Sequence, residues 1–138
     1  MLKKVTIAAG ATFGAIALTV GTAGTAQAAT SGTVSCSTPG ASGNYQYNNY
    51  YGPDATVYIY FSLTDTASDG NSVRVRMLSK DVNGATTYYP WRANTGGYNT
   101  TSKWQTTASN SRGLFDIGIQ VARINTNGSI RNICTSWS

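Results

Sequence analysis

The side chains in this sequence that could do chemistry are chiefly aromatic rings and guanidinium groups, which bind ligands but do not usually transform them. The sequence contains no histidine, so Ser–His and Cys–His nucleophiles and most zinc sites are excluded. It also contains no glutamate, and a pair of catalytic carboxylates would have to come from five aspartates. From this inventory we predict that the protein is not an enzyme and holds neither a metal ion nor an organic cofactor.

The five aspartates have ordinary structural explanations. Four lie in or beside segments with turn-forming residues, where aspartate commonly accepts hydrogen bonds from nearby backbone: Asp54, Asp65, Asp69 and Asp81. Asp116 follows Phe115 in an apolar segment, and we expect it to pair with an arginine across a sheet. The segment DTASDGN has oxygen ligands but not the spacing of a calcium-binding loop, so we interpret it as a hairpin loop.

The stretch YQYNNYY, from Tyr45 to Tyr51, contains four tyrosines in seven residues. Alternate side chains of a strand share a face, so Tyr45, Tyr47 and Tyr51 lie on one side and Tyr50 on the other. The four rings therefore cannot all be buried, and one or two should be partly exposed. Tyrosine mixed with Ser, Gly and Asn is also the chemistry of antibody-like contact surfaces. We interpret the stretch as half strand and half contact surface.

The elements that must position these residues are short strands. Alternating runs rich in Val, Ile, Thr and Tyr recur along the chain with turn residues between them, which indicates strands. The predicted strands span residues 33–37, 56–63, 72–82, 85–91, 101–107, 114–124 and 129–134. Seven or eight short antiparallel strands predict an all-β, single-domain β-sandwich, and an immunoglobulin-like topology is one possibility.

Two Asn-Gly pairs, Asn83-Gly84 and Asn127-Gly128, predict two-residue type I′ hairpins. The second hairpin pairs Val121 with Cys134 and so turns the cysteine toward the core. Cys36 and Cys134 are the two cysteines of the chain. In an exported protein such a pair is typically bridged, and we predict a disulfide between them.

The first hairpin would create an aromatic face. Its register pairs Leu78 with Tyr89 and Arg76 with Trp91, and an adjacent hairpin would pair Tyr60 with Arg76. The outward rows of this three-stranded meander are then Tyr60–Arg76–Trp91 and Tyr58–Leu78–Tyr89. Rings beside a guanidinium attract it by about 0.5–1 kcal/mol where exposed. The face could be ordinary packing or a recognition surface, and both interpretations stay open.

On the functional interpretation the protein is a binding module. Its candidate contacts are Tyr45, Tyr47, Tyr50, Tyr58, Tyr60, Arg76, Tyr89 and Trp91. Sugar rings stack on Trp and Tyr, whereas Tyr, Trp and Arg also anchor protein interfaces, so an extracellular glycan and a secreted or cell-surface protein are both candidate partners. An adaptor subunit is one alternative. Another is an inhibitor of a secreted enzyme that offers Arg92 or Lys103 from the loop spanning residues 92–103.

The N-terminus predicts where the protein acts. Lys3 and Lys4, an apolar run and the small-residue sequence AQA have the three parts of a signal peptide, which we expect to be cleaved after Ala28. A secreted domain of residues 29–138 would remain, with no membrane attachment, and the signal's Ala/Gly/Thr-rich composition is typical of bacteria.

The net charge of the chain is +5, and it falls to +3 when the two lysines of the signal peptide are removed. The basic residues of the chain are scattered along the sequence, whereas nucleic-acid-binding proteins usually concentrate them on one face. We therefore do not expect nucleic acid as a partner.

Overall fold

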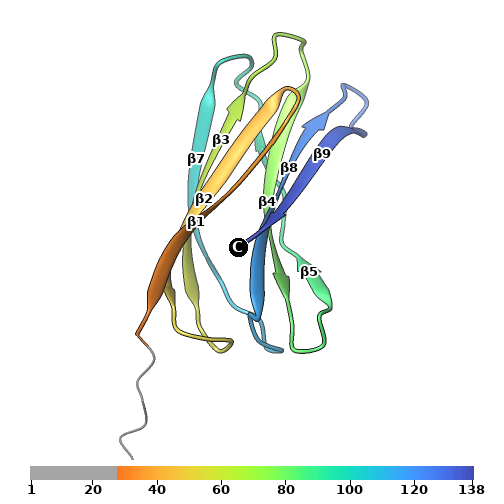
Figure 1. Ribbon diagram of the computed structural model, residues 1–138. Helices are drawn as coiled ribbons and strands as arrows, with labels where there is room; N and C mark the ends of the chain where they lie inside the picture. The colour runs from red at the N-terminus through yellow and green to blue at the C-terminus, as the bar shows by residue number, and fades with distance from the viewer. Residues whose placement is uncertain (1–27) are drawn as a thin grey trace, which may run out of the picture.

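Residues 28–138, which the computed structural model describes, form two antiparallel sheets packed face to face, as Figure 1 shows. The first sheet has the order β1-β2-β3-β7. Its strands are β1 (Thr30–Thr38), β2 (Ala41–Tyr50), β3 (Val57–Asp65) and β7 (Thr101–Ala108). The predicted all-β sandwich is confirmed. The expected signal peptide, residues 1–28, lies outside the described residues apart from Ala28.

The second sheet has the order β5-β4-β8-β9, and β6 also pairs with β4. Its strands are β4 (Ser72–Lys80), β5 (Thr86–Tyr88), β6 (Arg92–Asn94), β8 (Asp116–Ile124) and β9 (Ile130–Trp137). The described residues thus contain nine strands where seven or eight were expected. One reason is that the expected strand 85–91 is interrupted around Pro90, which has no N–H for the ladder.

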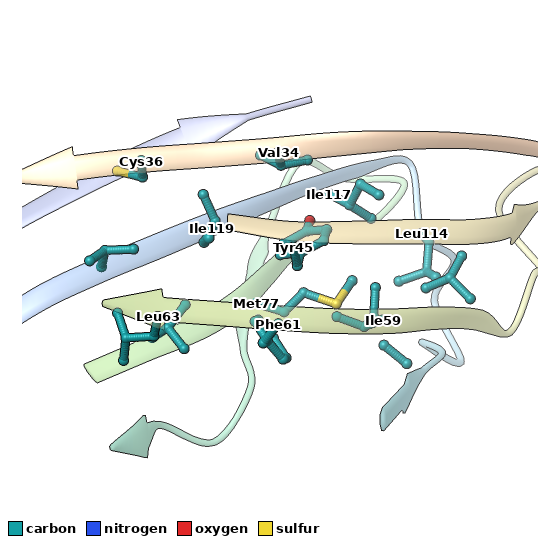
Figure 2. Close-up of a cluster of buried hydrophobic side chains, with 14 of the residues drawn as sticks. Val34, Cys36, Tyr45, Ile59, Phe61, Leu63, Met77, Leu114, Ile117 and Ile119 are labelled. Atoms are coloured by element: carbon teal, nitrogen blue, oxygen red, sulfur yellow. The ribbon is translucent and has the colours of Figure 1, made fainter. Parts of the chain in front are cut away.

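The core lies between the sheets and is built by alternation along the strands, which is clearest in β3. In β3 the apolar residues Val57, Ile59, Phe61 and Leu63 are all buried, while Tyr58 and Tyr60 between them are exposed. Because successive side chains point to opposite faces, one strand can fill the core and still present tyrosines to solvent. The β4 and β8 strands supply Val73, Val75, Met77, Ile117, Ile119 and Val121 from the other sheet, and Figure 2 shows part of the resulting cluster.

The strand connections resemble those of immunoglobulin-like sandwiches. The neighbours β2-β3-β7 correspond to strands A-B-E of that fold, and β4-β8-β9 correspond to C-F-G. The chain crosses between the sheets three times, from β3 to β4, from β6 to β7 and from β7 to β8. The β1 strand adds a hairpin partner at the open edge of β2.

The expected hairpin between β3 and β4 is wrong, because these strands belong to different sheets. The β3 strand pairs with β2 and β7, and β4 pairs with β8, β5 and β6. The alternation of apolar residues indicates which side chains face the core. It does not indicate which sheet a strand belongs to, because strands of both sheets show the same alternation. The segment from Thr66 to Asn71 crosses between layers.

The two Asn-Gly turns are hairpin turns of a different type from the one expected. Only the glycines have positive φ, 77° at Gly84 and 86° at Gly128, whereas a type I′ turn needs positive φ at both central residues. The Gly84 N–H donates to the carbonyl of Asp81, and the Asp81 N–H donates to the carbonyl of Ala85. This is a type I turn followed by a glycine bulge.

The extra loop residue changes the register of β5. Leu78 pairs with Tyr88, not with Tyr89 as expected, and a shift of one residue moves each side chain to the opposite face. At the second hairpin an irregularity between Arg123 and Ile124 compensates for the bulge. The predicted pairing of Val121 with Cys134 is therefore confirmed.

Replacing Gly84 with alanine should lower the free energy of unfolding by about 1 kcal/mol, because alanine is strained at positive φ. No neighbouring heavy atom lies within 4 Å of the position a Cβ would take, so the cost is conformational and not steric. Asn83→Ala should change stability by less than about 0.5 kcal/mol. Urea unfolding of both variants tests this. Equal losses of unfolding free energy at the two positions would contradict the type I turn and favour a type I′ turn.

The predicted disulfide is confirmed: Cys36 in β1 is bonded to Cys134 in β9, with 6.0 Å between their Cα atoms. The β1 strand ends one sheet and β9 ends the other. The bond therefore fastens the two sheets together at one edge of the sandwich.

Candidate binding surfaces

Tyr45, expected as a ligand contact, is a core residue. Its side chain is fully buried, and its Oη donates a hydrogen bond to the Gly118 carbonyl of the opposite sheet at 3.1 Å. Burial raises the pKa of the Tyr45 phenol above its ordinary value, so the hydroxyl stays protonated and remains a donor. Figure 2 shows Tyr45 between the sheets. The expected binding role is wrong. Tyr45 is the cross-strand partner of the buried Val34, and residues paired in this way point to the same side of a sheet, which here is the core.

Tyr47 and Tyr50 are partly buried and pack against the core, so only part of each ring is accessible, and their expected ligand roles stay predictions. Asn49 has a φ of 65°, and the β1–β2 register shifts at this point. A bulge of this kind turns the following side chain to the other face, which brings Tyr50 to the same side as Tyr47. The Tyr50 Oη donates to the Leu114 carbonyl at 2.8 Å, and burial raises the pKa of this phenol. Tyr51 alone projects outward, 43% exposed.

The expected single plane of Tyr58, Tyr60, Arg76 and Trp91 does not exist. Tyr58 and Tyr60 lie on the outer side of the first sheet, and Arg76 lies on the outer side of the second. Since β3 and β4 are in different layers, their outward residues point away from each other. The candidate contacts therefore divide between two separate surfaces.

The first surface, the aromatic–arginine face, is formed by Arg76, Tyr88, Trp91 and Trp137 of the second sheet. The guanidinium carbon of Arg76 is 4.3 Å from the ring centre of Tyr88 and 4.2 Å from that of Trp91. The expected contact between Arg76 and Trp91 is thus present despite the changed register. Lys80 lies 4.2 Å from the ring of Trp137 in the same manner.

Arg76 is held in place by hydrogen bonds, and it takes part in none of the ion pairs formed within residues 28–138. Its Nε donates to Gln120 Oε1 at 2.8 Å, and Gln120 Nε2 donates to Thr135 Oγ1 at 3.0 Å. Within residues 28–138 the three ion pairs use other cations: Lys80–Asp116, Arg112–Asp81 and Arg123–Asp69. Desolvation by its neighbours lowers the pKa of Arg76 from its ordinary value. The guanidinium is therefore preorganised, partly desolvated and not neutralised.

Sequence reasoning missed two members of this face, Tyr88 and Trp137, and assigned Tyr89 to it in place of Tyr88. Tyr88, 56% exposed, occupies the outward position expected of Tyr89. Tyr89 is partly buried and its Oη donates to the Ser109 carbonyl at 3.0 Å, so it is not part of this face, and its expected binding role stays a prediction. Trp137 packs against Gly118, where a side chain would collide with the indole. A hairpin template with a three-residue loop would have identified Tyr88.

The second surface, the tyrosine–amide face, is the outer side of the first sheet. Cross-strand pairing places Tyr60 between Gln46 and Gln105, and Tyr58 between Asn48 and Thr107. All six side chains are exposed. Tyr58 and Tyr60 are thus accessible, as expected, but their neighbours are amides and hydroxyls and not arginine.

The segment 92–103 does not present its basic residues at a loop tip. Arg92 lies in β6 and Lys103 in β7. Between them the buried Asn94 accepts from Gly96 N–H and Thr100 Oγ1 and donates to two carbonyls. The loop is well ordered by these bonds and exposes Tyr98. This arrangement does not favour an inhibitor that offers a basic residue to a protease.

The aspartates serve the structural roles expected for most of them. Oδ1 of Asp65, Asp69 and Asp81 each accepts a nearby backbone N–H. Asp116 pairs with Lys80 at 3.9 Å and not with an arginine, since Lys80 is its cross-strand neighbour. Among residues 28–138, no group of three Asp, Glu, His or Cys side chains could hold a metal ion.

No protein-family model, curated protein or solved structure matches this chain. In the described part of the chain, no helix is long and apolar enough to cross a membrane.

Proposed function

We propose that the protein is a secreted, non-catalytic binding module that recognises an acidic protein partner through the aromatic–arginine face. The observation that carries this proposal is Arg76, which is stacked between two rings and oriented by Gln120 without a neutralising carboxylate. A fold that only needed packing at this position would be served as well by an apolar residue. A positioned, partly desolvated guanidinium is suited to an incoming anionic group.

The charges around the aromatic–arginine face favour an acidic partner. Arg74, Arg76 and Lys80 occupy outward positions of β4. The carboxylate that shares this side of the sheet, Asp116, is already paired with Lys80. Arg–carboxylate hydrogen bonds are charge-assisted, and they strengthen when aromatic rings exclude water from them.

The apolar residues beside the face favour a protein over a charged polysaccharide. Ile130 and Ile133 of β9 are 48% and 43% exposed. Ile133 pairs with Ala122 on the same side of the sheet as Thr135 and Trp137. Trp, Tyr and Arg are the residues that most often dominate protein interfaces. Apolar side chains of a protein partner can also bury the exposed isoleucines, which would stay exposed to solvent beside a sugar polymer.

Affinity capture from the native producer's culture medium tests this proposal. The protein, purified from cells that express the full chain, should retain an acidic protein, and Arg76→Gln should weaken that complex by about 2 kcal/mol, or roughly thirtyfold. Tyr58→Ala on the other sheet is the matched control and should leave the affinity unchanged. A partner that binds the Arg76→Gln variant equally well, or the absence of any retained protein, would contradict the proposal.

A further inference from the structure

We infer a second binding site on the opposite side of the sandwich: the tyrosine–amide face takes an uncharged polysaccharide chain. This inference is independent of the proposed function, because it concerns the other sheet and none of its residues belongs to the aromatic–arginine face. Its argument rests on the state of two tyrosines, the charge of their surroundings and the shape of the surface.

The two tyrosines of this face are not used by the fold. Tyr58 and Tyr60 are 48% and 38% exposed. In the described chain, the hydroxyls of Tyr45, Tyr50 and Tyr89 each donate to a backbone carbonyl. Within the same residues, the hydroxyls of Tyr58 and Tyr60 form no such bond. Their rings and hydroxyls are therefore available to a ligand.

The rings lie side by side with hydrogen-bonding groups on both flanks. Tyr58 and Tyr60 are two residues apart in β3, which separates them by roughly 7 Å along one face. Gln46 and Gln105 flank Tyr60 across the neighbouring strands. Amide groups both donate and accept hydrogen bonds. The C–H faces of sugar rings pack against tyrosine while amides bind the sugar hydroxyls, so this pattern suits consecutive sugars of a chain.

The charge of the surface selects the class of ligand. The outward positions of β1, β2, β3 and β7 carry Ser, Thr, Asn, Gln and Tyr, and the one charged residue among them is Lys103. Cross-strand hydroxyl pairs continue the pattern away from the tyrosines, with Thr64 and Thr101 oxygens 2.7 Å apart. Arg92 and Lys103 line a depression at one border of this face, beside Tyr60 and Gln105. Elsewhere on the face a polyanion would find no cation on the four strands, and a typical protein partner would find little apolar area. An uncharged polyhydroxylated chain matches both properties.

The surface is open on both sides of Tyr60. A depression of about 240 Å³ is lined by residues that include Thr33, Gln46, Tyr47 and Tyr60. A second depression of about 370 Å³ is lined by Tyr58, Tyr60, Gln105 and Thr107. Two open depressions separated by one ring fit an extended chain that crosses the strands better than a single enclosed small molecule.

A binding assay with defined polysaccharides tests the inference. The purified protein should sediment with at least one insoluble neutral polymer from the set cellulose, chitin and β-1,3-glucan. Tyr60→Ala and Tyr58→Ala should each weaken that binding by at least about tenfold, the loss of one stacking contact. Tyr60→Trp keeps a stacking ring and should retain the binding.

Tyr88→Ala, which removes from the opposite face a tyrosine that is at least as exposed, is the matched control and should bind the polymer normally. Unchanged thermal unfolding of each variant should exclude misfolding, because all these rings are exposed. The inference is overturned if no neutral polymer binds, if only anionic polymers bind, or if the Tyr58 and Tyr60 variants bind as the wild type does. The Arg76→Gln variant separates this result from the proposed function, since it should lose the protein partner and keep the polysaccharide.

Discussion

Removing the bond between Cys36 and Cys134 is expected to lower the free energy of unfolding by about 4–5 kcal/mol. The two cysteines are 98 residues apart, and closing a loop of that length removes much of the conformational freedom of the unfolded chain. Small domains are stable by only about 5–15 kcal/mol in total. The loss would therefore leave a domain that is close to unfolding at ordinary temperatures.

The measurement is urea unfolding of the double variant Cys36→Ala with Cys134→Ala, compared with the wild type before and after reduction. The reduced wild type should unfold at nearly the same urea concentration as the double variant. The double variant itself should not respond to the reductant. A fully reduced wild type with an unchanged midpoint would show that packing between the sheets, and not the covalent link, secures this edge of the sandwich.

Tyr45→Ala is expected to lower the free energy of unfolding by about 3–5 kcal/mol, the usual cost of removing a buried aromatic side chain. The ring is fully buried and packs edge-on against Phe61, with 5.5 Å between ring centres. The substitution would leave a cavity between the sheets. It would also leave the Gly118 carbonyl without the hydroxyl that now donates to it.

Two further variants divide this loss into its parts. Tyr45→Phe keeps the ring and removes the hydrogen bond, and it should cost about 1–2 kcal/mol. Tyr58→Ala, which removes the same side chain from an exposed position, should change stability by less than about 0.5 kcal/mol. Chemical unfolding of the three variants measures these differences. Equal losses for Tyr45→Ala and Tyr58→Ala would contradict the placement of Tyr45 in the core.

The two candidate faces were only partly predictable, and the reason is visible in particular residues. Arg76 and Trp91 were correctly placed in contact, and Tyr58 and Tyr60 were correctly expected outside. Combining the four into one surface was wrong, because that step assumed that β3 and β4 pair. Tyr88 and Trp137 were missed because their positions depend on a loop length and on a glycine in the neighbouring strand.

Local pattern alone determined most of the strands, many of their inward residues and the pairing of the two cysteines, because alternation records which side of each strand is apolar. The sheet to which each strand belongs depends on pairing between distant segments, and the same alternation fits either layer. Only the tertiary structure decided that the exposed tyrosines and the stacked arginine face away from each other. It also decided, through a bulge at Asn49 and a three-residue turn at Gly84, which tyrosines are buried and which meet solvent.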